Sequence, residues 1–280
     1  MKVMKIIRIL FLFTLFLFFI SCMSGSGEIN PVRKRVISSL NDDLGGPADI
    51  TIGSTQYSFA VCADTHIGDK EEELFDKILK SSTSGGDKFL IVVGDITNWG
   101  KKSQYEVFKN HIGKYTYPHG IFSAIGNHDV FGNGWKNFKD ILGPSVYSFQ
   151  SEDALFIVLD SANGTLGKEQ FDWLEDTLRE NDKENIFVFT HMGVFTGTFS
   201  SFFKMDSQEE IYRLIYMLKK YKADYVFSGH LHTFNVKEIE GINFVITGGA
   251  GQGLLDSGSN HYVRVTVNGS EITISKIEID

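Results

Sequence analysis

Two histidines, His230 and His232, stand one residue apart in the stretch FSGHLHTFN, at the end of an apolar run. Because side chains at positions i and i+2 of a strand project from the same face, the two imidazoles could bind one object together. Metal coordination is the chemistry that such a pair can perform, whereas an isolated H-x-H is more often surface or packing histidine. The pair by itself leaves both interpretations open.

Acidic, imidazole and amide side chains also follow four other apolar runs. They are Asp64 and His66 after YSFAVCA, Asp95 after KFLIVVG, Asn127, His128 and Asp129 after GIFSAIG, and His191 after NIFVFT. Ligands of open α/β sheets bind beyond the carboxyl ends of the strands, so these residues are expected at one edge. A single buried histidine is ordinary, but so many buried polar groups together require partners or cations.

The residue types in this set indicate which cations would bind. Asp, His and Asn suit Mn, Fe, Zn or Co better than a metal that prefers thiolates. Two ions about 3.5 to 4 Å apart need a carboxylate that can bridge them. We therefore expect two divalent transition-metal ions as cofactors, and Gly94 and Gly229 would let the backbone turn sharply beside them.

The strands that must position these side chains are short and rich in Val, Ile and Phe. They are expected at residues 57–63, 88–94, 120–126, 154–160, 185–190 and 224–229. Between them, apolar positions at helical spacing predict helices around residues 74–79, 171–178 and 211–218. A capping box of Asp206 and Glu209 would begin the last helix. Alternating strands and helices predict an α/β domain with a largely parallel central sheet.

After residue 233 the sequence shows only strand patterns. They lie at residues 234–240, 242–248, 262–267 and 271–279. Asn268-Gly269 predicts a two-residue hairpin turn between the last two strands. The apolar phase then slips from Ile272 and Ile274 to Ile277 and Ile279, which suggests a bulge near Ser275 or Lys276. A parallel core followed by an antiparallel tail predicts mixed sheets.

The N-terminus resembles a secretory signal. Lys2, Lys5 and Arg8 precede the apolar stretch Ile9 to Ile20, and Ser21 and Cys22 follow it. The stretch has 12 residues, which is short for a membrane-spanning helix, although an uncleaved anchor is the alternative.

The quartet Phe19-Ile20-Ser21-Cys22 resembles a bacterial lipobox, with Phe19 in place of the usual Leu. Cleavage before Cys22 would leave that cysteine lipid-modified and the protein membrane-anchored outside the cytoplasm. The alternative is an ordinary cleaved signal with an incidental cysteine. We expect residues 1–21 to be the signal peptide, 22–50 a Ser-, Gly- and Asn-rich tether, and 51–280 the folded domain.

The charge balance of the chain excludes one class of partner. The formal net charge is −8, and it becomes −11 once the three basic residues of the signal are removed. An acidic protein of this kind is not expected to bind nucleic acid through charge. Cys62 would remain as the one thiol besides Cys22, and its position in YSFAVCA predicts a buried small hydrophobe.

The ordered series D-x-H, G-D, G-N-H-D, H and G-H-x-H resembles the calcineurin-like metallophosphoesterase superfamily from about residue 57 to 253. The resemblance implies a four-layer α/β/β/α sandwich with two mixed β-sheets. It also assigns the ligands: Asp64, His66 and His232 to one ion, Asn127, His191 and His230 to the other, and Asp95 to both. His128 would stand over the substrate phosphoryl group, with Asp129 orienting its imidazole.

This resemblance predicts hydrolysis of a small phosphate ester. The ions would generate hydroxide near neutral pH, and this nucleophile would attack phosphorus in line. Gly94 to Asn98 lack the Asp-Arg of protein Ser/Thr phosphatases, so a phosphoprotein substrate is not expected. Asn98 stands where purple acid phosphatases have Tyr, so a ferric ion bound by tyrosinate is not expected either. The remaining pattern is similar to that of phosphodiesterases, including cyclic-nucleotide phosphodiesterases, and a phosphodiester is the favoured substrate. A phosphomonoesterase or nucleotidase with the same site, and a non-catalytic metal-binding surface lipoprotein, are the alternatives.

Two further stretches could shape specificity. Residues 193–205 carry Phe195, Phe199, Phe202 and Phe203. These rings could form an aromatic lid or a wall on which a base stacks, or the loop could simply bury its own aromatic side chains. The stretch GGAGQG at residues 248–253 does not match the dinucleotide fingerprint, because Leu254 occupies the last glycine position. It is instead expected to form a tight loop near the metal-binding edge.

Overall fold

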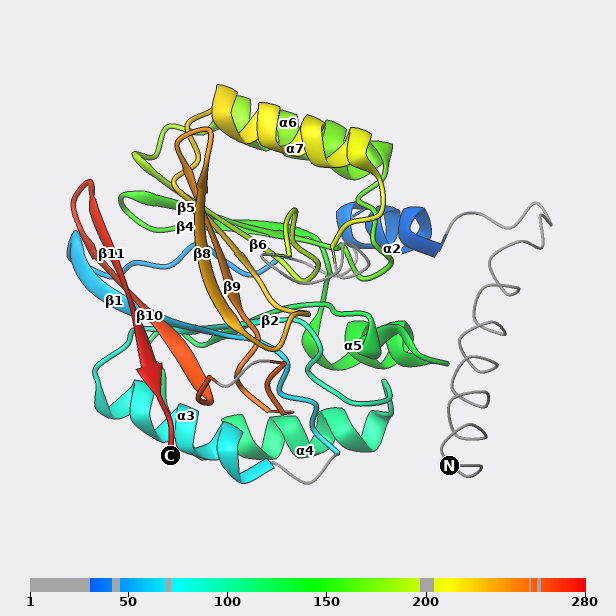
Figure 1. Cartoon of the computed structure of the whole chain (residues 1–280), viewed down its shortest axis with the longest axis vertical. Coiled ribbons are helices and arrows are strands. Elements are labelled where there is room, and N and C mark those ends of the chain that lie inside the picture. The colour runs from blue at the N-terminus through cyan, green and yellow to red at the C-terminus, as the bar shows by residue number, and fades with distance from the viewer. Residues whose placement is uncertain (1–30, 42–45, 69–71, 197–203, 252, 256–257) are drawn as a thin grey trace, which may run out of the picture. The chain divides into compact units, whose positions relative to one another are not determined.

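The apolar runs of the sequence form two β-sheets in the computed structural model of the chain, which describes residues 31–41, 46–68, 72–196, 204–251, 253–255 and 258–280. The chain divides into the units Met1–Pro31 and Val32–Asp280, and the second contains both sheets (Figure 1). The expected signal peptide lies outside the described residues. Among the described helices, none is long and apolar enough to span a bilayer.

The first sheet has five strands. In spatial order they are β11 (Glu271–Glu278), β10 (His261–Asn268), β1 (Gln56–Cys62), β2 (Leu90–Val93) and β3 (Ile121–Ala124). Strands β1, β2 and β3 are parallel, whereas β10 runs antiparallel to both β1 and β11. The three parallel strands therefore end at the same edge.

The second sheet has six strands. In spatial order they are β4 (Tyr147–Gln150), β5 (Ala154–Leu159), β6 (Asn185–Thr190), β7 (Tyr225–Ser228), β9 (Ile242–Thr247) and β8 (Phe234–Ile239). The four inner strands are parallel, and β4 and β8 are antiparallel edges. Both sheets are mixed, as predicted.

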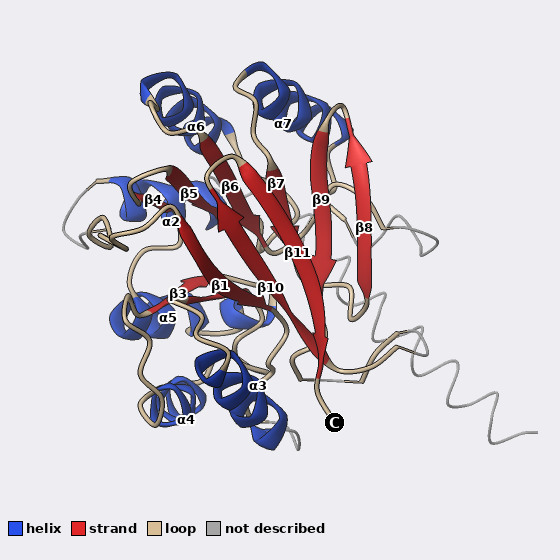
Figure 2. Ribbon diagram, turned by 90° about the vertical axis from the view of Figure 1, so that its left-hand side faces the viewer, coloured by secondary structure: helices blue, strands red, loops and turns tan. Residues whose placement is uncertain are grey.

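Helices cover the outer faces of the two sheets (Figure 2). The five-stranded sheet is covered by α3 (Glu72–Ser84), α4 (Lys102–Ile112) and α5 (Gly134–Leu142), and the six-stranded sheet by α6 (Lys168–Glu180) and α7 (Gln208–Lys220). The four-layer α/β/β/α sandwich is thus confirmed. A short 3₁₀ turn, His128–Val130, follows β3.

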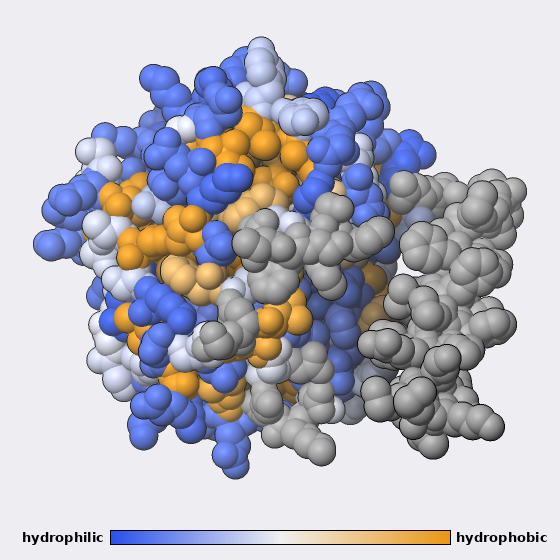
Figure 3. Space-filling view, viewed as in Figure 1, coloured by the Kyte–Doolittle hydropathy of each residue, from blue (hydrophilic) through white to orange (hydrophobic). Residues whose placement is uncertain are grey.

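Aromatic side chains fill the space between the sheets. Phe59 of β1 stacks on Phe89 at 4.7 Å between ring centroids, and meets Phe156 of β5 edge-on at 5.6 Å. Such ring pairs add stabilisation beyond the area that they bury. On the face shown in Figure 3, hydrophobic residues emerge between α7 and the strands below it, while the outer sides of the helices are mainly hydrophilic.

The expected bulge in the last strand is wrong. Strands β10 and β11 pair without interruption from His261 with Glu278 to Asn268 with Glu271. The phase slip has a different cause: Ile272 and Ile274 pack into the core between the sheets, whereas Ile277 and Ile279 pack into the core beneath α3 and α4. A regular strand with period two contacts both cores when its apolar residues change face along its length.

The prediction of a tether at residues 22–50 is wrong in part, because residues Pro31–Leu40 form helix α2. Val32 and Val36 are buried on one side of this helix and pack with Val146. Arg35 is buried too, and it forms two hydrogen bonds of 2.7 and 2.9 Å with the carboxylate of Asp160. The sequence pattern does not indicate this helix, because Arg35 occupies a position on its buried side, where an arginine is rarely found.

The start of α7 differs from the expected capping box by one residue. The N-cap is Ser207, whose Oγ accepts a hydrogen bond from the backbone N–H of Glu210 at 3.2 Å. Asp206 instead lies outside the helix, where its N–H donates to the carbonyl of Gly164. A serine N-cap serves the first turn in the same way as the expected aspartate.

Candidate metal centre

The carboxyl ends of strands from both sheets meet at one place and bring the predicted residues together. Loops after β1, β2 and β3 come from the five-stranded sheet, and loops after β6 and β7 come from the six-stranded sheet. Hydrogen bonds join the sheets at this point. The ring Nδ1 of His191 lies 3.0 Å from the carbonyl oxygen of Val93, and the N–H of His230 donates to the carboxylate of Asp64 at 3.0 Å.

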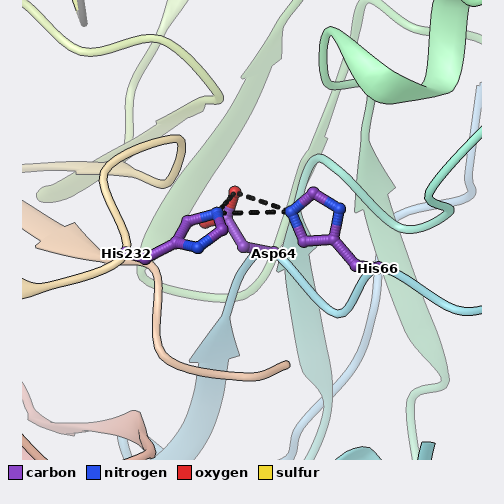
Figure 4. A group of neighbouring side chains, drawn as sticks. All are labelled: Asp64, His66 and His232. Carbon is purple, nitrogen blue, oxygen red and sulfur yellow. Dashed lines mark hydrogen bonds and ion pairs between the residues drawn. The ribbon is translucent and has the colours of Figure 1, made fainter. Parts of the chain in front are cut away.

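The first group of candidate ligands consists of Asp64, His66 and His232. The Nε2 atoms of His66 and His232 lie 3.3 Å apart, and they lie 4.0 and 3.5 Å from Oδ1 of Asp64. Figure 4 shows the two imidazoles turned toward the same carboxylate from opposite sides. Two nitrogens and one oxygen directed at one point are a donor set that a divalent transition metal prefers.

The second group consists of Asp95, His191 and His230. Nε2 of His191 lies 3.2 Å from Oδ2 of Asp95 and 3.0 Å from Oδ1 of Asn127. Asn127 therefore brings an amide oxygen to the same position as the histidine and the carboxylate. This group could hold a second ion.

Asp95 lies between the two groups. Its Oδ1 accepts a hydrogen bond of 2.8 Å from the N–H of His128, which fixes the carboxylate. Its Oδ2 lies 3.2 Å from Nε2 of His191 in one group and 3.8 Å from Nε2 of His66 in the other. A carboxylate in this position can contact a cation on either side.

Strained backbone is concentrated at this centre. Among the described residues, six other than glycine have positive φ angles, and four of them are candidate ligands: Asp64 (63°), His66 (44°), Asp95 (48°) and His230 (66°). Each such residue costs about 1–3 kcal/mol and persists only where the surroundings enforce it. The fold thus holds these side chains in directions that relaxed strand ends would not provide.

Glycines make room for the candidate ligands. A Cβ atom on Gly94 would lie 2.5 Å from Nδ1 of His191, and one on Gly248 would lie 2.8 Å from Oδ2 of Asp64. A Cβ atom on Gly251 would lie 2.5 Å from the carbonyl oxygens of Asp64 and Thr65. The stretch at residues 248–253 therefore packs beside this centre, as predicted, although residue 252 is outside the described residues.

The ionisation states of the two carboxyls favour cation binding. Asp64 and Asp95 are both buried, and burial alone would raise the pKa of each. The neighbouring imidazoles outweigh burial, because His232 lowers the pKa of Asp64 and His191 lowers that of Asp95. The carboxyls are thus ionised, which is the form that binds metal.

The histidines respond to the same charges in two ways. Burial lowers the pKa of His230 to about 4 and also lowers that of His66, so both candidate ligands are neutral near pH 7. Burial would also lower the pKa of His191, but Asp95 raises it to about 9. The field of Asp95 therefore favours a positive charge at Nε2 of His191, which a proton or a metal ion can supply. The donor set fits divalent cations.

His128 lies beside the centre, on the turn after β3. Its side chain is 28% exposed, and its Nε2 lies 4.0 Å from Oδ2 of Asp95. The structure corrects the expected role of Asp129 in orienting it, because Nδ1 of His128 lies 2.9 Å from the backbone carbonyl of Asn98. A carbonyl accepts only from a protonated nitrogen, so this contact places a proton on Nδ1 and directs Nε2 toward the centre.

Asp129 binds backbone groups of two loops rather than the imidazole of His128, and the neighbouring residues in the sequence do not indicate these contacts. Its carboxylate is buried and accepts hydrogen bonds from the N–H groups of Ile96, Thr97 and Gly126, at 3.0 to 3.1 Å, and from the hydroxyl of Tyr105 at 3.0 Å. It thereby joins the loop after β2 to the loop after β3. These loops carry a candidate ligand each.

Comparison with known proteins identifies relatives of this arrangement. Residues 57–234 match the family model described as calcineurin-like phosphoesterase. A probable cyclic nucleotide phosphodiesterase of Fibrobacter succinogenes is 26% identical over 199 residues, which are 66% of this chain and 76% of that protein.

Solved structures share the fold. A purple acid phosphatase from yellow lupin superposes with a TM-score of 0.68 at 14% identity, over 80% of this chain, although this chain spans only 52% of the lupin protein. A dimetal phosphatase from Danio rerio gives a TM-score of 0.65 at 12% identity, over 79% of this chain and 95% of that one. At these identities the likeness concerns the fold alone.

Proposed function

The chain belongs to the calcineurin-like phosphoesterase family, and from this premise we propose that it hydrolyses a phosphodiester with two divalent metal ions. It is a metal-dependent hydrolase of phosphoric esters, since the family model covers every strand end that carries a candidate ligand. The number of ions and the preference for diesters are the proposed part.

The observation that supports two ions is the position of Asp95. Its Oδ2 faces His191 of one donor group and His66 of the other, at 3.2 and 3.8 Å. Two divalent ions, when bound, supply an acidic water as nucleophile and positive charge for the phosphoryl oxygens. Mn, Fe, Zn and Co all suit these nitrogen and oxygen donors.

Side chains of the protein would orient the ester and donate a proton to it. Asn127 and His191 meet at 3.0 Å and hold one side of the centre, while the 28% exposed His128 faces the space where a phosphoryl group would lie. Protonated at both nitrogens, His128 would donate from Nε2 to a phosphoryl or leaving-group oxygen. The Asn98 carbonyl keeps the other proton on Nδ1 and so maintains that orientation.

Two features favour a diester. Residues 94–98 contain no arginine that could pair with the additional charge of a monoester. The Fibrobacter relative also carries the name of a phosphodiesterase.

The experiment is a comparison of esters. The purified protein is loaded with Mn, Fe, Zn or Co and offered 4-nitrophenyl phosphate and bis(4-nitrophenyl) phosphate, beside an Asn127→Ala variant. We expect turnover of the diester and a large loss of activity in the variant. Turnover of the monoester alone would instead indicate a phosphatase or nucleotidase, and metal uptake without turnover a binding lipoprotein.

We also propose that the protein is anchored outside the cytoplasm by lipid on Cys22. The support is the basic and apolar N-terminal sequence followed by Phe19-Ile20-Ser21-Cys22. These residues lie outside the described part of the chain. Helix α2 begins at Pro31, so only eight residues, 23–30, would separate the lipid-modified Cys22 from this helix.

A further inference from the structure

A row of aromatic rings leads away from the candidate metal centre to the surface. His66 meets His128 at 4.6 Å between ring centroids, His128 meets Phe131 at 5.0 Å, and Phe131 meets Trp99 at 5.9 Å. Trp99 remains 54% exposed at the end of this row. It is the most exposed of the three tryptophans of the chain, and it lies two ring contacts from the imidazole that faces the phosphoryl position.

The backbone around Trp99 is held in place. The N–H of Trp99 donates to Oε1 of Gln104 at 3.0 Å, and the carbonyl of Asn98 is in contact with Nδ1 of His128. Gly100 has a φ angle of 62° and packs so closely that a side chain would not fit. An exposed indole on a fixed loop is ready to bind a flat group, because little conformational entropy is lost on binding.

We propose that Trp99, supported by Phe131, stacks on a nucleobase carried by the diester whose phosphate binds beside His128. This inference rests on the proposed function and identifies the substrate class. An indole face binds any base by stacking and reads no hydrogen-bond pattern. The site would therefore accept all bases and prefer purines, whose stacking area is larger.

The row of rings also indicates that the group stacked on Trp99 belongs to the same molecule as the phosphate beside His128. Phe131 contacts both Trp99 and His128, so the indole and the candidate proton donor belong to one continuous surface. Other exposed aromatic residues, Tyr212 and Tyr216, lie on α7 over the six-stranded sheet. Within the part of the chain that the structure describes, no ring contact links them to His128, and they serve as matched controls.

The first test compares substrates with and without a base. KM and kcat are measured for 3′,5′-cyclic AMP and for glycerophosphocholine, an aliphatic diester, with Trp99→Ala, Trp99→Phe and Tyr212→Ala. Trp99→Ala should raise KM for the cyclic nucleotide about tenfold, because stacking of one base commonly contributes at least this much. It should leave kcat within about twofold and the aliphatic KM unchanged. Trp99→Phe should recover most of the loss, and Tyr212→Ala should behave as wild type.

An equal rise of both KM values, or no rise, would overturn the inference while the phosphodiesterase function stood. If wild type hydrolysed no diester, the proposed function would fail. A binding measurement would then test, independently of turnover, whether a base stacks on Trp99. Metal-loaded protein is titrated with adenosine 3′,5′-cyclic phosphorothioate, a slowly hydrolysed analogue, and tryptophan fluorescence is followed. Quenching should occur with this analogue but not with inorganic phosphate. It should disappear in Trp99→Phe, which keeps a ring but removes the indole; quenching that persists there would reject Trp99 as the contact.

Discussion

His66 and His232 face each other with their Nε2 atoms 3.3 Å apart, although 166 positions separate them in the chain. One follows β1 in the five-stranded sheet and the other follows β7 in the six-stranded sheet. Because both imidazoles are directed at Asp64, a cation between them would join the two sheets at their common edge. The metal content of variants tests this relationship.

His232→Ala should remove one ion. It leaves one imidazole and one carboxylate in the first group, and metal affinity there should fall at least a hundredfold, since even partners of ligands contribute about 10- to 100-fold. The metal content after dialysis, measured by plasma mass spectrometry, should fall by about one ion per chain. His119→Ala, which changes a histidine outside both groups, should keep the wild-type content; an unchanged content in His232→Ala would remove this residue from the ligand set.

His128→Ala should separate rate from metal binding. We propose that the imidazole faces the phosphoryl group, and with His66 and Asp95 it also forms a third group of atoms that could hold an ion. We expect kcat to fall about 10²- to 10³-fold, as is usual when a positioned proton donor is lost, with a smaller loss of metal than of rate. Equal activity of wild type and variant would reject the proposed role.

Asp129→Asn should weaken both stability and turnover. Its carboxylate accepts from three backbone N–H groups and from the Tyr105 hydroxyl, and an amide NH₂ would face some of those donors. The free energy of unfolding, from urea titration, should fall by about 2–4 kcal/mol because buried donors lose their acceptor. kcat should fall at least tenfold, since the loops after β2 and β3 would no longer be joined. Asp140→Asn, an exposed change on α5, is the matched control and should alter neither quantity.

Asp76 provides a pH-dependent contribution to stability. Burial raises its pKa, but contacts with His111, Lys114 and Tyr115 together outweigh burial and lower the pKa to about 2. A depressed pKa stabilises the fold above the unfolded value of about 3.8, and this contribution is lost as the pH falls from about 4 toward 2.

Asp76→Asn should therefore lower the free energy of unfolding by about 0.5–1 kcal/mol at pH 7, a modest value because solvent screens this site. Urea titrations of both proteins at pH 7, 4 and 3 should show this difference shrinking with acidity. A difference that stayed constant with pH would show that the carboxylate charge is not responsible.

Cys22→Ala should release the protein from the membrane. When the full chain is expressed in a bacterium fed with labelled palmitate, wild type should carry label and sediment with membranes. The variant should carry none. Cys62→Ala controls for the second cysteine, which is buried in β1. Label retained by Cys22→Ala would exclude the proposed anchor.

Local patterns predicted most of the strands correctly because the inner strands are continuous apolar runs, buried on both faces, that are followed by Gly, Asp or other polar residues. These patterns failed where a segment contacts two different cores, or where its burial depends on a partner far away in the sequence. In β11, Ile274 faces one core and Ile277 the other, which in one dimension looks like a bulge. In α2, Arg35 is buried only because Asp160 is there to pair with it, and that partner lies 125 residues away.

The amino-acid sequence by itself determined the donor types, their order along the chain and their positions at strand ends. Those properties depend on residue identity and on the period of neighbouring side chains. Only the tertiary structure decided what each polar group contacts. Asp129 lies next to His128 in the chain but binds the backbone of the neighbouring loop, and Asn98 orients His128 through a carbonyl that every residue possesses. Trp99 likewise acquires a candidate role only because Phe131 links it to the metal centre. Contacts between distant loops depend on how the two sheets pack, and short-range periodicity carries no information about that packing.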